Sequence, residues 1–227
     1  MSKAIVAVVH FSDVLCVWAY ITQIRIDELR DNFADEVHIN YRFLQVFGDV
    51  PGKMIAQWAD RGGLDGYAAH VQEVAAQFPH ISISPQAWLA NTPKSSLPAH
   101  LLLCGARVMD AAAPDSDSPD LVEQLLRALR HAFFVETVDV SKLQALFEVA
   151  GQTSIDVVEL KRIIDGGAAH AHLAADLAAA VQSGVRASPT LMFNEGRQIL
   201  AGNVGYRVLE ANIRELLRSP DEQQSWC

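Results

Sequence analysis

The chain opens on a pattern of apolar and polar residues that predicts a strand, a helix and a second strand. Ala4–Phe11 is short, β-branched and almost uniformly apolar, as expected of a strand covered on both faces of a sheet. Beyond Cys16, apolar residues recur at three- and four-residue spacing as far as Leu29, which predicts an amphipathic helix. Val37–Val46 alternates apolar and polar residues and is rich in β-forming types, so it predicts a second strand. Cys16 therefore lies where the first strand gives way to the first helix.

The middle of the chain has helical periodicity almost throughout. Gly48–Gly52 breaks the pattern, and from Met54 to Gly166 the apolar spacing follows a helix, with no convincing strand and no internal repeat. The predicted helices lie near Leu64–Gln77, Leu97–Ala112, Leu121–Phe134 and Ser141–Val149, and the clearest loop is Pro114–Pro119.

The C-terminal part returns to a mixture of helix and strand. Its predicted elements are an alanine-rich helix at Ala168–Gln182, strands at Thr190–Asn194 and Gln198–Ala201 joined by a turn at Asn194–Gly196, a helix at Tyr206–Arg218, and a frayed tail at Ser219–Cys227.

The order of these elements indicates an α/β fold. The two ends supply β-α-β and α-β-β-α, which together predict a thioredoxin-like fold, a mixed central sheet flanked by helices. The helical middle then becomes a large all-helical insertion domain. We expect residues 1–48 and 167–227 to form the discontinuous thioredoxin-like domain and residues 49–166 to form the insertion.

Composition and charge narrow the class of partner. The chain has 227 residues, and its hydrophobic content of 50% favours a folded globular protein. Eighteen basic residues against 27 acidic ones give a net charge of −9, which argues against nucleic acid or an anionic membrane as a partner. No apolar run reaches the roughly 20 residues of a membrane span, and the opening residues lack the features of a signal peptide. We expect a soluble cytoplasmic protein.

Three widely separated cysteines exclude a disulfide-stapled framework and have to be judged singly. Cys104 lies in an apolar helical stretch, which predicts an inert core thiol. Cys227 is terminal, so we expect an exposed and incidental thiol. The histidines form no metal set, because His170 and His172 are two residues apart on a helix and point in different directions. No metal is expected.

Cys16 is the cysteine whose position predicts chemistry. The first turn of a helix presents unpaired N–H groups and the positive end of the helix dipole, and both favour thiolate over thiol. We therefore expect a lowered pKa and an accessible, nucleophilic sulfur. The alternative is a buried, inert cysteine at a helix start.

A second candidate element is the loop before the strand at Thr190. In Gly184–Thr190, Pro189 precedes a β-type run, and a cis Ser188–Pro189 bond would expose the backbone of Ser188 toward an extended peptide or thiol compound. The alternative is an ordinary trans proline at a strand edge.

These two segments resemble one family. Ser12–Tyr20, with the sequence SDVLCVWAY, is similar to the S-D-x-x-C-P-W-C-Y motif of cytoplasmic DsbA-like thiol–disulfide oxidoreductases, and Gly184–Thr190 is similar to their G-V-x-G-x-P loop. The same superfamily contains 2-hydroxychromene-2-carboxylate isomerases and kappa-class glutathione transferases. The resemblance covers nearly the whole chain. It implies that Cys16 is the active-site thiol and Pro189 the cis proline, and it also allows a homodimer.

One departure from the family pattern favours monothiol chemistry among the family's activities. Ala19 stands where dithiol enzymes have a second cysteine, so a mixed disulfide on Cys16 has no internal resolving thiol in this C-x-x-A site. The resemblance then implies a monothiol oxidoreductase with no tightly bound cofactor. We expect an external thiol, glutathione as cosubstrate, to regenerate Cys16, and the substrate to be a small thiol or a disulfide-containing peptide or protein.

Two other functions stay open. The isomerases and kappa transferases carry a G-[QS]-D-R segment that holds glutathione, and Gly202–Gly205 corresponds to it here, with Asn203 retained as a candidate and Val204 in place of the acid. A glutathione-dependent isomerase or transferase acting on an aromatic small molecule is therefore one alternative. A non-catalytic peptide- or thiol-binding protein is the other.

Further residues are candidates for lining the site around Cys16. His10 ends the first strand and either polarises the thiol or is structural. Trp88, Asn91 and Thr92 fall in the insertion, where they are candidates for a wall of the substrate site. The remaining substrate- or thiol-binding candidates are Ser12, Trp18, Ala19, Tyr20, Arg186 and Ser188.

Overall fold

The computed structural model describes residues 5–112 and 120–218. The predicted loop at Pro114–Pro119 and the predicted tail at Ser219–Cys227, with its cysteine, lie outside the described residues.

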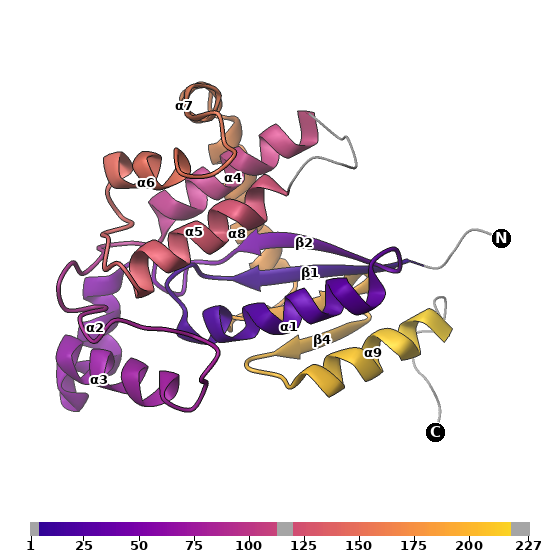
Figure 1. The fold of residues 1–227 in the computed structure, drawn as a ribbon, viewed down its shortest axis with the longest axis horizontal. Coiled ribbons are helices and arrows are strands. Elements are labelled where there is room, and N and C mark those ends of the chain that lie inside the picture. The colour runs from indigo at the N-terminus through magenta and orange to yellow at the C-terminus, as the bar shows by residue number, and fades with distance from the viewer. Residues whose placement is uncertain (1–4, 113–119, 219–227) are drawn as a thin grey trace.

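A four-stranded mixed sheet forms the centre of the molecule, as predicted (Figure 1). Its strand order is β2-β1-β3-β4, with β1 parallel to β2 and antiparallel to β3, and with β3 antiparallel to β4. The strands span Val6–Ser12 (β1), Val37–Phe43 (β2), Thr190–Phe193 (β3) and Gln198–Ala201 (β4). The second strand ends before the predicted Val46, because β1 has already ended at Ser12 and offers β2 no further partner.

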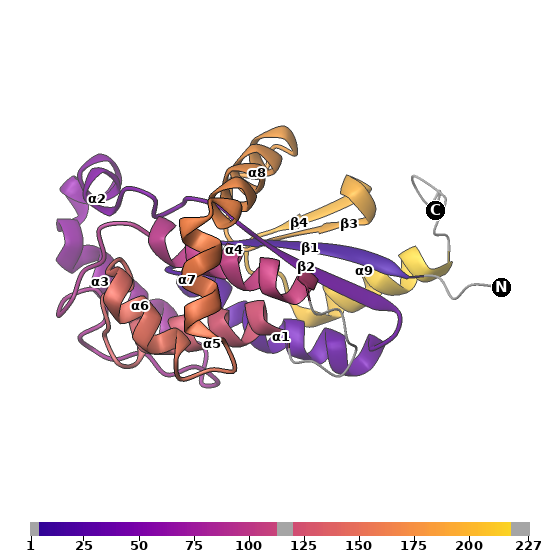
Figure 2. The ribbon, with the colours of Figure 1, turned by 90° about the horizontal axis from the view of Figure 1, so that it is seen from above.

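Helices cover the two faces of this sheet unequally. The helices α1 (Val17–Phe33) and α9 (Tyr206–Arg218) lie on one face, and α8 (Ala168–Gln182) lies on the other (Figures 1 and 2). Side chains alternate along β1 accordingly. Val8 belongs to the main apolar core, whereas Phe11 belongs to a small separate cluster that includes Ala180 of α8.

The segment between β2 and α8 is helical in its described part. It contains α2 (Val50–Trp58), the 3-10 helix η1 (Ala59–Arg61), α3 (Gly63–Ala75), α4 (Leu97–Ala112), α5 (Leu121–Phe134), α6 (Leu143–Ala150) and α7 (Val157–Asp165). One apolar core runs from the sheet into these helices. The division into two domains at residues 48 and 166 stays a prediction.

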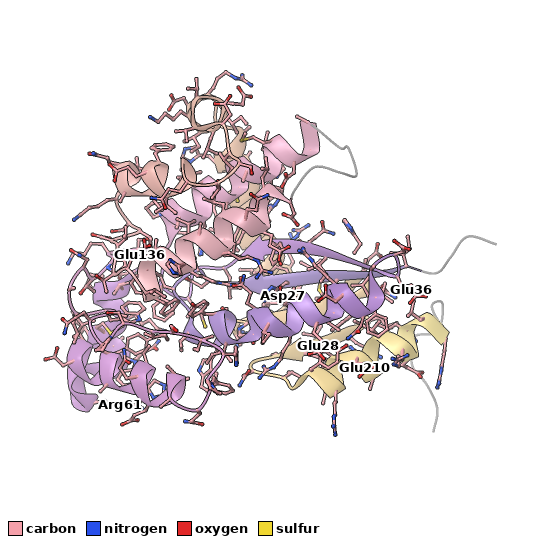
Figure 3. All side chains as sticks on the ribbon, in the orientation of Figure 1. Asp27, Glu28, Glu36, Arg61, Glu136 and Glu210 are labelled. Carbon is pink, nitrogen blue, oxygen red and sulfur yellow. The ribbon has the colours of Figure 1, made fainter. Side chains whose placement is uncertain are left out.

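Ion pairs add to the packing between the helical segment and α1. Arg127 of α5 pairs with Asp27 of α1 and with Glu123 of its own helix. Figure 3 shows Asp27 on the side of α1 that faces α5, while its neighbour Glu28 lies on the side of α9. These pairs are partly exposed, so each contributes at most about 1 kcal/mol.

Three local differences from the predicted elements have physical reasons. Gly48–Gly52, which was expected to interrupt the regular structure, contains the start of α2. The helix begins there because the Asp49 side chain accepts from the Gly52 N–H and Pro51 occupies the first turn. α7 begins after another capping aspartate, Asp156. The turn at Asn194–Gly196 is a short 3-10 helix, η2. None of the described helices is long and apolar enough to cross a membrane.

Candidate active site

Cys16 and Ser188 meet at the centre of the candidate site. Cys16 is the N-cap residue of α1, with extended backbone geometry, and its thiol donates to the Ser188 carbonyl oxygen at 3.1 Å. The Ser188–Pro189 peptide bond is cis. Two segments 172 residues apart in sequence therefore join at the sulfur.

The surroundings of Cys16 contradict the expected accessible thiolate. The residue is only 6% exposed, and this burial raises the pKa of its thiol. The Ser188 hydroxyl and the N–H groups of Ala19 and Trp18 act to lower that pKa, whereas the charge of Asp13 raises it further. The expected donors at the helix start are thus present, but desolvation outweighs them. At neutral pH the resting group is a thiol that donates to Ser188.

Asp13 connects the loops that form the site through hydrogen bonds. Its fully buried carboxylate accepts from the Leu15 N–H at 2.9 Å, from the Phe47 N–H at 2.8 Å and from the Ser96 hydroxyl at 2.8 Å. Its own N–H donates to Ser188 Oγ at 2.9 Å. One residue therefore ties the Cys16 loop to the loop after β2, to the start of α4 and to the cis-proline loop.

His100 of α4 supports the same loop from the other side. Its Nε2 accepts from the Val14 N–H at 3.1 Å, and its ring stacks on Phe43 at 5.3 Å between centroids. Burial lowers the pKa of His100, although the nearby Asp13 and Asp176 charges oppose this, so the ring acts as a neutral acceptor.

Two residues of the helical segment lie within electrostatic range of Cys16. Burial lowers the pKa of Lys53 in α2, while the charges of Asp13 and Cys16 act to raise it. Burial also raises the pKa of Tyr67 in α3 well above its usual value, with Cys16 and Asp13 adding to the rise. The Lys53 ammonium lies 5.0 Å from the Phe47 ring centroid. The sequence held no local signal for either residue, since both are far from Cys16 along the chain.

Arg130 of α5 forms a buried polar cluster under the site. It is 1% exposed, and its guanidinium donates to Ser12 Oγ and to Gln23 Oε1, both at 3.2 Å. Among the described residues, no carboxylate forms an ion pair with it and its Nε has no hydrogen-bond partner. Burial lowers the pKa of Arg130 to about 10, so it remains charged at neutral pH. Ser12, a substrate-binding candidate, is fully buried in this cluster.

His10 lies in the same interior region and is 1% exposed, 5.6 Å from the Tyr41 ring centroid. Burial, together with the charges of Arg130 and Arg30, lowers the pKa of His10 to about 3. The ring is therefore neutral at pH 7, and neither ring nitrogen has a hydrogen-bond partner among the described residues. Its role in polarising the thiol stays a prediction, while its burial matches the structural alternative.

The candidates on the first turns of α1 lie at different depths. Ala19 is fully enclosed. Trp18 is half-buried against Phe78, with 6.0 Å between ring centroids, and Tyr20 is half-buried in a parallel stack on Phe134 at 5.0 Å. Trp18 and Tyr20 therefore pack against the helical segment and still reach the surface.

The other candidates are divided between surface and core. Arg186 is exposed two residues before Ser188. Asn203 is exposed too, but its side-chain oxygen already accepts from Arg25, as does the Val204 carbonyl at 3.0 Å. That contact leaves the acceptor of Asn203 engaged within the protein.

Trp88, a candidate for the wall of the substrate site, is buried inside the helical segment and does not line a surface. This ring is 1% exposed and lies about 5 Å, between centroids, from the rings of Phe47, Tyr67 and Phe133. Asn91 Nδ2 donates to the Thr137 carbonyl, and the Thr92 hydroxyl donates to the Trp88 carbonyl. The ring contacts of Trp88 and the two backbone contacts of Asn91 and Thr92 therefore lie within the helical segment. Cys104 is fully buried, as predicted, and burial raises its pKa to about 12.

Residues 7–214 match the model of the DSBA-like thioredoxin domain. The chain belongs to this family. The match includes Cys16, the helical segment and the cis-proline loop, so one family pattern accounts for both halves of the site and for the helices between them.

Solved structures share the fold of this DSBA-like domain at low sequence identity. A candidate protein disulfide isomerase from Nitrosomonas europaea is 15% identical, with a TM-score of 0.74 over 94% of this chain and 98% of its own. The cytosolic disulfide reductase DsbM from Pseudomonas aeruginosa is 16% identical, with a TM-score of 0.66 over 92% of this chain and 99% of its own. A 2-hydroxychromene-2-carboxylate isomerase is 17% identical, with a TM-score of 0.61 over 96% of this chain and 100% of its own. Both redox proteins and an isomerase therefore use this fold.

One curated relative is similar in sequence over part of the chain. The ClpXP adapter protein SpxH from Bacillus licheniformis is 31% identical over 99 residues, which are 41% of this chain and 33% of SpxH. The matched stretch thus spans about a third of that relative's length.

Proposed function

We propose that this DSBA-like protein catalyses monothiol thiol–disulfide exchange through Cys16. The observation that carries the proposal is the contact between the Cys16 sulfur, at the N-terminus of α1, and the Ser188 carbonyl beside the cis Pro189 bond. A disulfide lying along that loop would meet the sulfur at the point where the Trp18 and Ala19 N–H groups favour a developing thiolate.

The exchange has two balanced steps. Cys16 loses its proton to solvent, and the thiolate attacks one sulfur of a disulfide, which forms a mixed disulfide and releases the other sulfur as a thiolate that takes up a proton. Because Ala19 offers no second sulfur, an external thiolate then attacks the mixed disulfide and releases Cys16. The net reaction exchanges one thiol for another and leaves the protein reduced.

Glutathione is the external thiol that we propose for the second step, in a cytoplasmic setting and without a tightly bound cofactor. Two considerations support it. Glutathione is the abundant small thiol of reducing compartments. A solved structure of the similarly folded reductase DsbM, 14% identical with a TM-score of 0.64, is described with GSH.

Burial of the thiol favours a second candidate, a protein that binds peptides without catalysis. A raised pKa leaves Cys16 largely protonated at neutral pH, and the partly matching relative SpxH is named an adapter. In this alternative the cis-proline loop binds a partner segment, and the Cys16 side chain has only a packing role.

Steady-state turnover separates the two candidates. The protein is mixed with glutathione, glutathione reductase, NADPH and hydroxyethyl disulfide, and the rate of NADPH oxidation is compared with that of a Cys16→Ser variant. We expect turnover that rises with pH and is lost in Cys16→Ser but retained in Cys104→Ala, whose thiol is enclosed elsewhere in α4. Equal rates for the native protein and Cys16→Ser would overturn the exchange function and leave the binding function.

A further inference from the structure

Two facing rows of side chains join α1 to α5, and the row on α1 starts at Cys16. Three contacts connect the rows, each between one residue of α1 and one of α5: Asp27 with Arg127, Gln23 with Arg130, and Tyr20 with Phe134. Figure 3 shows Asp27 on the side of α1 that faces α5. The three α1 residues follow Cys16 by four, seven and eleven positions, so they lie on the helix face that begins at Cys16.

Arg130 extends from this row to the loop that carries Cys16. Its guanidinium donates to Gln23 Oε1 on α1 and to Ser12 Oγ at the end of β1, both at 3.2 Å. Directly after Ser12 the chain makes a tight turn, in which the Cys16 N–H donates to the Asp13 carbonyl at 3.1 Å. The guanidinium is therefore held where the strand enters the turn that leads to the sulfur.

The charge of Arg130 has no ion-pair partner among the described residues. Its side chain is 1% exposed, and both of its hydrogen bonds go to neutral groups. A fully buried cation without a carboxylate partner lowers the stability of a fold, so such a charge is a candidate for a functional role. Arg127, one turn earlier on α5, differs because Asp27 and Glu123 neutralise it.

Cys16 is the group near Arg130 that gains a negative charge during exchange. A charge on Cys16 acts to raise the pKa of Arg130, and because the attraction between two charges is mutual, the guanidinium favours the Cys16 thiolate. Tyr41 and Asp13 act on Arg130 in the same direction. Burial raises the pKa of Tyr41, so that phenol is neutral at pH 7, and Asp13 acts on Arg130 less strongly than Cys16 does.

The other titratable groups in electrostatic range of the sulfur do not replace this charge. Asp13 opposes the thiolate, and Tyr67 is neutral at pH 7 because burial raises its pKa. Lys53 is a cation on α2, but it is only half-buried. Solvent and salt therefore screen Lys53 more strongly than they screen the enclosed Arg130.

We propose that Arg130 is a positioning residue for the exchange reaction, whose buried positive charge favours the thiolate form of Cys16 without touching the substrate. This inference rests on the proposed exchange function and assigns a further residue to it. In the first step the charge promotes loss of the Cys16 proton to solvent. In the second step the external thiolate attacks the other sulfur of the mixed disulfide, the S–S bond breaks, and the electron pair that stays on Cys16 is stabilised by the same charge.

Alkylation of Cys16 by iodoacetamide tests the proposal without a disulfide substrate. All proteins carry Cys104→Ala and Cys227→Ser, so that Cys16 is the remaining cysteine. Arg130→Met removes the charge and keeps most of the side-chain volume. We expect it to lower the alkylation rate at pH 7 roughly three- to tenfold, because a unit charge about 15 Å away changes an ionisation equilibrium several-fold at an effective dielectric constant of about 20.

Three further variants separate the charge from the structure around it. Arg130→Lys keeps a cation at this position, Gln23→Leu removes a contact of Arg130 without removing its charge, and Arg127→Met removes an ion-paired arginine from the same helix. All three should keep the native alkylation rate within about twofold. Should Arg130→Met lack the native circular dichroism spectrum, Arg130→Gln replaces it with the same expectation.

The outcomes distinguish this inference from the function on which it rests. A native alkylation rate in Arg130→Met overturns the role of the charge, and so does a loss in Arg130→Lys or Gln23→Leu as large as that in Arg130→Met. Failure of the native protein to turn over hydroxyethyl disulfide overturns the exchange function instead. Alkylation then still decides whether Arg130 favours the thiolate, because alkylation needs no exchange.

Discussion

The Ser96 hydroxyl, directly before α4, donates to the Asp13 carboxylate at 2.8 Å across 83 residues of sequence. This contact joins the helical segment to the loop that carries Cys16, and both groups are fully buried. The cost of removing the carboxylate is therefore predictable from its partners.

Asp13→Ala leaves three buried donors without an acceptor, on Leu15, Phe47 and Ser96. We expect the free energy of unfolding to fall by about 3–5 kcal/mol, measured by urea denaturation. Asp49→Ala is the control, since that exposed carboxylate caps α2 through a single 3.0 Å contact with the Gly52 N–H and contributes about 1 kcal/mol. Equal losses in the two variants would contradict the role of Asp13 as a junction.

The reactivity of Cys16 is expected to follow its raised pKa. In a Cys104→Ala/Cys227→Ser background, iodoacetamide should alkylate Cys16 at pH 7 more slowly than a free thiol, because the raised pKa lowers the fraction of thiolate. The rate should still be rising at the alkaline end of the titration. A plateau reached below neutral pH would show that the sulfur is held as a thiolate, contrary to its burial.

Arg130 provides a test of an unpaired buried charge. A pKa lowered to about 10 corresponds to roughly 3 kcal/mol of destabilisation, offset in part by about 1 kcal/mol for each contact with Ser12 and Gln23. Arg130→Met keeps most of the side-chain volume, so we expect unfolding to cost about 1–2 kcal/mol more than in the native protein.

The control for that variant is Arg127→Met, one turn earlier on α5. Arg127 is ion-paired with Asp27 and Glu123, so its loss should cost up to about 1 kcal/mol. Thermal and urea unfolding of both variants would measure the difference. A destabilised Arg130→Met variant would mean that the charge at position 130 is compensated in the fold.

His10 predicts a pH dependence of stability. Its folded-state pKa is about 3 against an ordinary value of 6.5, so between these values the unfolded chain binds a proton that the folded chain does not. Stability is therefore lost as the pH falls through this window. From about pH 7 to about pH 4.5, the His10 contribution amounts to a loss of about 2–3 kcal/mol.

Replacing His10 by phenylalanine removes this contribution. Urea denaturation at pH 7 and pH 4.5 measures how much the free energy of unfolding falls between these pH values. This fall should be about 2–3 kcal/mol smaller in His10→Phe than in the native protein. His38→Phe, at an exposed position of β2, should keep the native pH dependence. An unchanged pH dependence in His10→Phe would mean that His10 is protonated in the folded state.

The elements that were predictable from sequence are those with strong local signals. Helices such as α5 and α8 lie where periodicity predicts them, and α5 begins at a capping aspartate, Asp120, whose side chain accepts from the Glu123 N–H. α2 was missed because Gly48–Gly52 contains turn-forming residues, although Asp49 and Pro51 are also typical of a helix start.

The site was predictable only in part, for a different reason. Its two loops were brought together by family resemblance, and the N–H groups expected at the start of α1 do face the sulfur. Burial was not predictable, because it depends on long-range packing. Lys53, Tyr67 and Arg130 reach the neighbourhood of Cys16 from three different helices, and nothing in the local sequence around Cys16 indicates them.

The full enclosure of Ala19 limits how this chain could acquire a dithiol site. A cysteine at that position would add a sulfur atom to a closely packed place, and its neighbours would have to shift to accommodate the atom. An Ala19→Cys variant would therefore gain a second thiol on the same helix turn as Cys16 at the expense of some stability of the fold.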